Sequence, residues 1–356
     1  MKQSILMGIT ALLLAVFLPA ALLSPAEAAQ PEPMVVTVEQ PAAAPEEAPE
    51  EAPEEVPEEA PEEAPEEKAV QEASYDEETS ISLLTGNDVQ SLPLSEYLTG
   101  VVLSEMPASF QLEALKAQAV AARTFTLRHV AAGKHDTADL CADSSCCQAW
   151  ASLDALQDKL GDAFSQYWQK AAQAVEETDG MVLTYDGQLI DAVYFSCSGG
   201  ATEDAVAVWG GDVAYLQSVE SPGEEISSKF ETEVTFTPAE FSRMLTAANP
   251  ACDFSGSVQS WFGETVTTDG GGVGTMVIGG QMFEGTELRT LLHLNSAKFT
   301  VEADAEEIRF TVSGYGHRVG MSQYGAEAMA RDGSTFEEIL LHYYTGVTLT
   351  RMTATD

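Results

Sequence analysis

The stretch Leu103-Ser104-Glu105-Met106-Pro107 lies within residues 92–133, the region around which the rest of the chain is organised. After it, apolar or small side chains recur at helical spacing through residues 109–128, at Leu112, Leu115, Ala119, Ala122 and Phe125. Ser109 is expected to cap this helix, and Gly133 to stop it. Because Pro107 disfavours helical backbone before it, Glu105 is expected in a short segment just ahead of the helix. A carboxylate held there suits a catalytic acid, and an ordinary acidic loop residue fits the same pattern.

A glycine-rich stretch near the other end is Gly314-Tyr315-Gly316-His317-Arg318-Val319-Gly320-Met321-Ser322-Gln323-Tyr324-Gly325-Ala326. Its glycines allow a tight loop, and Ser322 is expected to cap the helix that follows. His317 has two interpretations, since a lone histidine in such a loop is more often structural than catalytic.

A third stretch, Tyr194-Phe195-Ser196-Cys197-Ser198-Gly199-Gly200, follows a predicted hairpin. Paired glycines let backbone approach a ligand closely, which would suit a polar sugar. An ordinary tight turn is the alternative.

The first two stretches, with residues 92–98 and 113–124, resemble the stage II sporulation protein D family over about residues 80–350. The resemblance implies that Glu105 is the acid and base of a lytic transglycosylase, which cuts the glycan strands of peptidoglycan. It also implies that the three stretches line one groove. The substrate-binding residues expected there are Arg123, Ser196, Ser198, Gly199, His317, Ser322, Gln323 and Tyr324. For Arg123 a structural ion pair is an equal alternative.

The expected reaction cleaves the bond between N-acetylmuramic acid and N-acetylglucosamine. An ordinary glycosidase uses two carboxylates. A lytic transglycosylase uses one, which protonates the leaving oxygen and then takes the proton of the muramic C6 hydroxyl as a 1,6-anhydro ring closes. The sequence offers no second obvious catalytic carboxylate, which agrees with this scheme. Glu105 must be protonated near neutral pH, so its burial is expected to raise its pKa. A non-catalytic amidase enhancer, which relatives sharing this domain exemplify, is the alternative function.

A histidine and three cysteines fall in the loop after the first helix: His135, Cys141, Cys146 and Cys147. Imidazole and thiolate ligands suit a structural, tetrahedral zinc site. The resemblance supports zinc, because related loops carry a similar Cys-Gln-Ala-aromatic run, here Cys147-Gln148-Ala149-Trp150. Relatives often have histidine where this chain has Cys146, so the fourth ligand is open. The alternative is an extracytoplasmic disulfide.

The remaining pattern predicts an α+β fold, with a main lobe and a smaller β-rich lobe at about residues 220–300, around a substrate groove. A helix is expected from Phe164 to near Gly180, then a hairpin of residues 181–185 and 189–195. Short helices are expected at 284–292, 322–331 and 335–344, the last with a Thr335–Glu338 capping box.

The N-terminal part predicts export. Residues 1–28 combine an apolar run with an A-x-A cleavage site, which predicts a signal peptide. If this segment is not cleaved, it is expected to anchor the chain in the membrane. Residues 29–79, with Pro-Glu-Glu-Ala repeats, are expected to form an acidic tether. The formal net charge of -41 excludes a broad nucleic-acid-binding face. We expect the protein to act outside the cytoplasm, on the outer side of the membrane or in the cell wall. The resemblance suggests denuded glycan strands, a role in engulfment during sporulation, and a membrane complex with a wall amidase.

Overall fold

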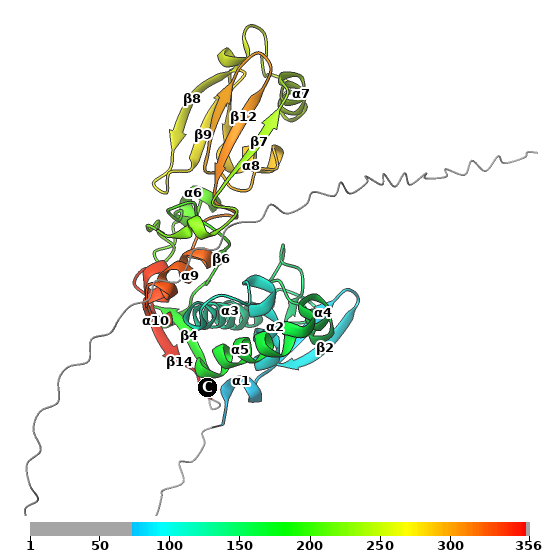
Figure 1. Ribbon diagram of the computed structural model, residues 1–356, viewed down its shortest axis with the longest axis vertical. Helices are drawn as coiled ribbons and strands as arrows, with labels where there is room; N and C mark the ends of the chain where they lie inside the picture. The colour runs from blue at the N-terminus through cyan, green and yellow to red at the C-terminus, as the bar shows by residue number, and fades with distance from the viewer. Residues whose placement is uncertain (1–72, 354–356) are drawn as a thin grey trace, which may run out of the picture. The chain divides into compact units, whose positions relative to one another are not determined.

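The fold comes from a computed structural model that describes residues 73–353. Its class is α+β, as predicted, with helices and several small sheets along the chain (Figure 1). The predicted signal and residues 29–72 of the predicted tether lie outside the described residues. Among the residues that are described, no helix is long and apolar enough to cross a bilayer. The buried apolar side chains form two separate cores.

The first core is built around α3 (Leu112–Ala132). Buried positions occur around most of this helix, because small residues such as Ala117, Ala119 and Ala121 let other elements pack closely from several sides. The elements that contact it include α2 (Leu94–Glu105), α5 (Phe164–Glu177), β4 (Met181–Tyr185), α9 (Gln323–Arg331) and α10 (Phe336–Tyr343).

The helix predicted at residues 109–128 therefore exists, but it begins later than expected. Gln111, not Ser109, occupies the N-cap position, and its side chain makes no capping hydrogen bond. The predicted end is confirmed, since Gly133 adopts a left-handed φ of 62° as the C-cap.

Helix α2 was not predicted, and it changes the setting of Glu105. This residue is the last of α2 instead of part of an irregular segment. The helix stops there because Met106, which precedes a proline, is extended at φ −113° and ψ 148°. Within α2, Gly100 faces the indole of Trp150, and an added Cβ would lie 2.5 Å from its Nε1. The close approach of Trp150 thus requires glycine in the middle of this helix.

The predicted hairpin is confirmed for its first strand and its turn. β4 pairs antiparallel with β5 (Gln188–Leu189), and the two turn residues Asp186 and Gly187 have φ of 50° and 73°, which a type I′ turn requires. The second strand is shorter than the predicted 189–195. Its last two residues form a separate strand, β6 (Tyr194–Phe195), which pairs in parallel with β13 (Met321–Ser322). This pairing joins two of the stretches singled out in the sequence.

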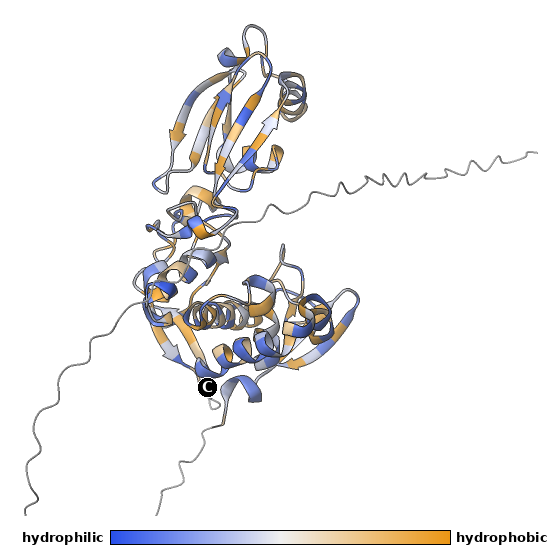
Figure 2. Ribbon diagram, in the orientation of Figure 1, coloured by the Kyte–Doolittle hydropathy of each residue, from blue (hydrophilic) through white to orange (hydrophobic). Residues whose placement is uncertain are grey.

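The second core lies in residues 231–313, and the smaller lobe was predicted at about residues 220–300. Exposed and less exposed residues alternate along β7 and β12, and Figure 2 shows the matching alternation of hydrophilic and hydrophobic residues, which is typical of sheets buried on one face. Phe310 packs against Phe236, Phe241 and Phe299 at ring-centroid distances of 5.5–5.9 Å. One sheet contains β7 (Glu231–Phe236), β11 (Phe299–Ala303) and β12 (Ile308–Ser313), and the other β8 (Phe262–Thr267), β9 (Val273–Ile278) and β10 (Gln281–Glu284).

The other short elements agree with local sequence signals. α8 (Gly285–Leu291) and α9 confirm two of the predicted short helices, and Ser322 caps α9 by accepting from the N–H of Gly325. The capping box of α10 is present as predicted. The remaining elements are β1 (Ser80–Thr85), β2 (Asp88–Pro93), β3 (Leu140–Cys141), α4 (Leu153–Leu160), α6 (Ala205–Trp209), α7 (Pro238–Ala248), β14 (Thr348–Arg351) and the 3₁₀ turns Gly161–Ala163, Glu224–Ile226 and Val258–Trp261.

The folded region begins earlier than predicted. The predicted tether extended to residue 79, whereas Tyr75–Glu78 form the helix α1, capped by Ser74. Asp76 of α1 is only 1% exposed and accepts hydrogen bonds from Arg123 in the middle of α3. The segment just before β1 is therefore part of the first core.

Candidate active site

Glu105 lines a cavity of about 600 Å³, a size typical of ligand sites. Its walls come from separate parts of the chain: the end of α2, residues 144–148, residues 191–196, and the glycine-rich stretch that holds His317 and Gln323. These include members of all three stretches predicted to meet in one groove. That part of the prediction agrees with the structure.

The Glu105 carboxylate is held by two donors. Oε1 accepts from the backbone N–H of Ala149 at 2.8 Å, and Oε2 accepts from Nε2 of Gln323 at 3.4 Å. Burial raises the pKa of Glu105, and these two hydrogen bonds act in the opposite direction. A carboxyl group that stays protonated at a pH above the ordinary pKa of glutamate is suited to donate its proton to a bound substrate.

Gln148 fixes the wall beside Glu105. Its Nε2 donates to the hydroxyls of Tyr97, at 3.1 Å, and Thr126, at 2.9 Å, while its Oε1 accepts from the Tyr194 hydroxyl at 2.7 Å. Burial raises the pKa of Tyr194 well above its ordinary value, so the phenol stays protonated. The sequence analysis assigned no site role to Gln148 or Tyr194, because no local pattern distinguishes them from other polar residues.

His317 forms part of the cavity wall as a neutral ring. Its Nδ1 accepts from the N–H of Val319 at 3.2 Å, so Nε2 carries the proton and donates to the Tyr194 carbonyl at 3.1 Å. Burial, together with the nearby charge of Arg289, lowers the pKa of His317 to about 4. Both ring nitrogens are engaged, which favours a positioning role over proton transfer.

Two exposed aromatic side chains flank His317. Trp209 is 52% exposed and Tyr315 is 43% exposed, and both line the cavity. The ring centroids of Trp209 and His317 lie 5.2 Å apart. Exposed aromatic faces in a cavity that also has polar walls are suited to stack against the apolar faces of sugar rings.

Four of the predicted substrate-binding residues do not line the cavity. Ser198, Gly199 and Ser322 are buried around the carboxylate of Glu224 instead. Oε2 of Glu224 accepts from the hydroxyl of Ser198 at 2.7 Å and from the N–H of Gly199 at 2.8 Å, and Oε1 accepts from Ser322. Tyr324 packs edge-on against Phe110, with ring centroids 5.1 Å apart. These four residues were predicted to contact sugar, but none of them lines this cavity.

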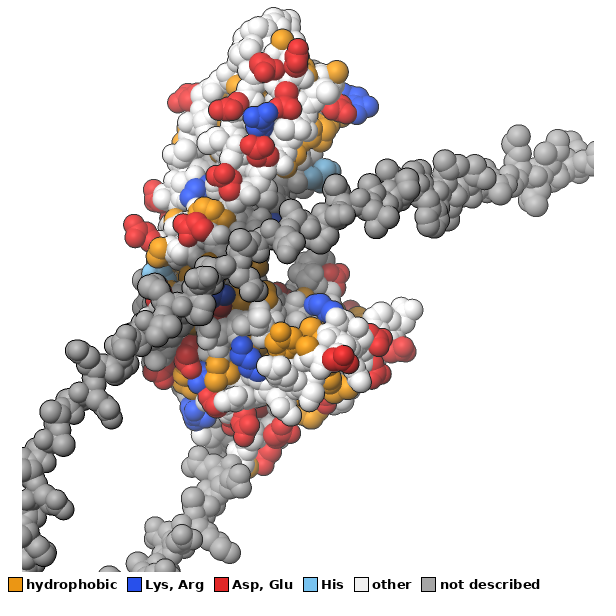
Figure 3. Space-filling view, viewed as in Figure 1, with side chains coloured by type: hydrophobic (Ala, Val, Ile, Leu, Met, Phe, Trp, Pro, Cys, Tyr) orange, Lys and Arg blue, Asp and Glu red, His pale blue; other side chains and the backbone are white. Residues whose placement is uncertain are grey.

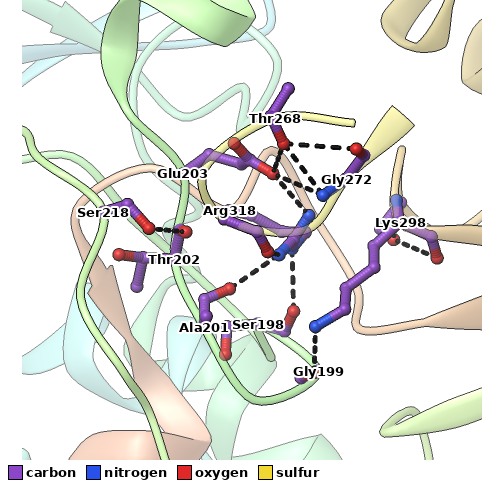
Figure 4. A network of polar contacts seen from close by, with 12 residues as sticks. Ser198, Gly199, Ala201, Thr202, Glu203, Ser218, Thr268, Gly272, Lys298 and Arg318 are labelled. Carbon is purple, nitrogen blue, oxygen red and sulfur yellow. Dashed lines mark hydrogen bonds and ion pairs between the residues drawn. The ribbon is translucent and has the colours of Figure 1, made fainter. Parts of the chain in front are cut away.

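Figure 4 shows further contacts of the turn that contains Ser198 and Gly199. The carbonyl of Ser198 accepts from Nε of Arg318, and the carbonyl of Gly199 accepts from Nζ of Lys298 at 2.8 Å. Arg318 also pairs with Glu203 at 2.9 Å, whose Oε1 accepts from Thr268 and Gly272. The turn thus links segments of the first core to loops that belong with the second.

Arg123 was predicted either to bind substrate or to form a structural ion pair, and the structure shows the ion pair. The side chain is fully buried and pairs with Asp76, with a further hydrogen bond from Nη1 to the Met181 carbonyl at 3.1 Å. It does not line the cavity. Of the predicted substrate-binding residues, Ser196, His317 and Gln323 remain at the cavity.

The predicted metal ligands are together. One ligand atom from each of His135, Cys141, Cys146 and Cys147 lies within 4.8 Å of the others. Nε2 of His135 is 3.3 Å from Sγ of Cys147 and 3.8 Å from Sγ of Cys146. Ligands of a tetrahedral zinc ion lie about 3.3–3.8 Å apart, given its bond lengths. None of the cysteines among the described residues forms a disulfide, and these four side chains are close enough to share one metal ion.

A second cavity, of about 470 Å³, lies beside α1. Its two buried or half-buried carboxylates are already engaged: Asp76 with Arg123, and Asp179 with Ser74 and the N–H of Tyr75. No free acid or base comparable to Glu105 is available among these partners.

Acidic side chains are scattered over the described face shown in Figure 3. The described surface in this view offers no extended basic face for a polyanion.

Comparison with known proteins identifies the family. A match to the family described as stage II sporulation protein covers residues 85–185. The stage II sporulation protein D of Bacillus subtilis (strain 168) is 41% identical over 75% of this chain and 77% of its own length. The chain belongs to the stage II sporulation protein D family. That of Bacillus amyloliquefaciens is 40% identical over 74% of this chain and 76% of its own. An amidase enhancer of Bacillus subtilis is 32% identical over 71% of this chain and 40% of its length.

Proposed function

We propose that this member of the sporulation protein D family is a lytic transglycosylase that cleaves the MurNAc-GlcNAc bonds of peptidoglycan strands. The observation that carries the proposal is the half-buried Glu105 carboxyl, with a raised pKa, in a cavity that also presents exposed aromatic rings. A cavity with both polar groups and aromatic faces suits a sugar, and a protonated carboxyl suits cleavage of its glycosidic bond.

In this reaction the Glu105 proton passes to the glycosidic oxygen as the bond from that oxygen to C1 of MurNAc breaks. The resulting carboxylate then accepts the proton of the C6 hydroxyl while O6 bonds to C1, which gives the 1,6-anhydro product and restores the acid. The N–H of Ala149 stabilises the carboxylate between the two steps. Gln323 donates to its other oxygen.

The cavity contains a second carboxylate, Asp191, which the sequence analysis did not anticipate. An inverting or retaining hydrolase would need such a group as base or nucleophile. The products decide between the schemes. Mass spectrometry of purified strands after digestion should show 1,6-anhydro ends; reducing ends would mean a hydrolase.

The alternative is a wall-binding amidase enhancer, which the similarity to a protein of that name supports. Under this alternative the protein binds strands, leaves them intact, and increases cleavage by an added wall amidase. The two functions therefore differ in the same assay. Intact strands with retained binding would favour the enhancer.

We also propose that His135, Cys141, Cys146 and Cys147 hold one structural zinc ion. Its contribution would be to fix the loop of residues 141–149, whose Ala149 N–H contacts Glu105. Zinc is not needed for the proton transfers themselves.

The setting proposed for this activity is extracytoplasmic, during engulfment in sporulation. The N-terminal sequence supports export, and the family supports sporulation. The expected partners are denuded glycan strands and a membrane complex containing a wall amidase. Fractionation of sporulating cells tests the location.

A further inference from the structure

Five described residues have a buried side-chain atom without a hydrogen-bond partner, and Asp191 is the one among them that lines the cavity of Glu105. Its Oδ1 is buried and has no hydrogen-bond partner, and no described residue donates to its other oxygen. Buried carboxylate oxygens are nearly always satisfied, because an unmet hydrogen bond at a charged group reduces stability. An exception in a cavity beside a catalytic candidate indicates a donor that arrives from outside the protein.

The backbone holds this carboxylate in place. Its N–H donates to the Tyr215 hydroxyl at 3.1 Å, and its carbonyl accepts from the N–H of Val193 at 2.9 Å. Asp191 lies in the irregular segment between β5 and β6, so these bonds, and not a strand, fix its position. A fixed acceptor loses little conformational entropy when a ligand binds.

Asp191 lies where two cavities meet. It lines the 600 Å³ cavity of Glu105, and also a neighbouring cavity of about 510 Å³ formed by the end of α3 and β5. His129 lines both as well. Arg128, on the wall of the second cavity, donates to the carbonyl of Leu189 at 2.7 Å instead of pairing with Asp191. The cavity of Glu105 is therefore continued by another, with an unsatisfied acceptor at the junction.

We propose that Asp191 is a substrate-binding carboxylate that accepts hydrogen bonds from hydroxyl or acetamido N–H groups of the glycan, and that the strand extends from Glu105 past Asp191 toward Arg128. This inference rests on the proposed function, because it takes a glycan strand as the ligand. A carboxylate can accept from two neighbouring sugar donors, so it would set the position of one sugar ring relative to Glu105.

The test measures binding without cleavage. The full chain carrying Glu105→Gln is titrated with the hexamer of β-1,4-linked N-acetylglucosamine, alone and with Asp191→Asn or Asp191→Ala added. Loss of hydrogen bonds to a charged group should raise the Kd about tenfold or more. The melting temperature should stay the same or rise, because each change removes a carboxylate whose buried oxygen has no hydrogen-bond partner. Asp162→Asn, at an exposed aspartate, is the matched control and should change neither quantity.

An unchanged Kd with a raised melting temperature would overturn the inference, since Asp191 would then be only an unsatisfied group. A lowered melting temperature would also count against it, because that result would give Asp191 a structural role. Failure of the proposed function looks different: the wild-type chain and the Glu105→Gln variant would both fail to bind the hexamer, or wild type would bind strands and form no anhydro ends.

Discussion

The backbone N–H of Ala149 donates to Oε1 of Glu105 across 2.8 Å, only two residues after Cys147. The loop with the histidine and cysteines therefore contacts the carboxylate that is expected to donate the proton. A disturbance of that loop reaches this carboxylate through a single hydrogen bond.

Replacement of Glu105 by Gln should reduce strand cleavage by at least about a hundred- to ten-thousand-fold, because one residue serves both proton transfers. The melting temperature and glycan binding should change little. Product analysis, thermal melts and strand pull-down measure the three quantities. Glu96→Gln is the matched control, since Glu96 is exposed on the same helix; Glu113 is unsuitable because it accepts from the N–H of Phe336. Anhydro products from the Glu105 variant at an appreciable rate would place the acid elsewhere.

Cleavage should depend on pH through the acid form of Glu105. Its pKa is raised, chiefly by burial, so kcat/KM should fall as pH rises through that raised value. Gln323→Ala removes a donor that favours the ionised form, which should move the alkaline fall to higher pH. Gln157→Ala, at an exposed position on α4, should leave the profile unchanged. A shift of the Gln323 variant to lower pH would contradict this account of the carboxyl.

Protein purified without chelator should contain about one zinc ion per chain by elemental analysis. Cys141→Ser should lower the zinc content and also reduce cleavage, because the loop that holds Ala149 would lose its anchor. The control is Cys252→Ser, because Cys252 packs against the second core; this change should alter neither the zinc content nor cleavage. Absence of metal together with a mapped disulfide among residues 141–147 would exclude the zinc site.

Two deletions in the N-terminal segment, of residues 29–72 and of residues 29–79, should have different effects on stability. Removal of residues 29–72 should leave soluble activity intact, because a charged tether supplies reach and no chemistry. Removal of residues 29–79 also takes away Asp76 and leaves Arg123 buried without its partner, which should cost about 3–5 kcal/mol in the free energy of unfolding. Chemical denaturation of the two proteins measures the difference. Equal stabilities would show that the pair contributes nothing.

Local signals in the sequence predicted the local parts of the fold. The Asp186-Gly187 turn, the Gly133 stop and the Thr335 capping box depend on residues a few positions apart, and all three are confirmed. α2 was missed because Gly100 and two β-branched valines weaken its helical pattern. Packing against Trp150, fifty residues away in the sequence, makes glycine necessary there.

The site residues also fall into those that the sequence could indicate and those that it could not. Glu105, His317 and Gln323 could be assigned because the motifs that contain them are long. Ser198 and Ser322 lie in the same motifs but bond to Glu224, a buried carboxylate in a separate turn that no spacing in the sequence connects to them. Asp191 was missed because a single aspartate between two strands looks like any loop residue until its missing hydrogen bonds are seen.

The position of Glu105 as the last residue of α2 links its acidity to the length of that helix. The C-terminal end of a helix carries a partial negative charge, which disfavours a second negative charge beside it. The helix therefore adds to burial in keeping the proton on Glu105, and the Ala149 N–H works against both. Extending or shortening α2 by one residue would alter the proton affinity of this carboxyl even if every residue of the cavity wall were kept.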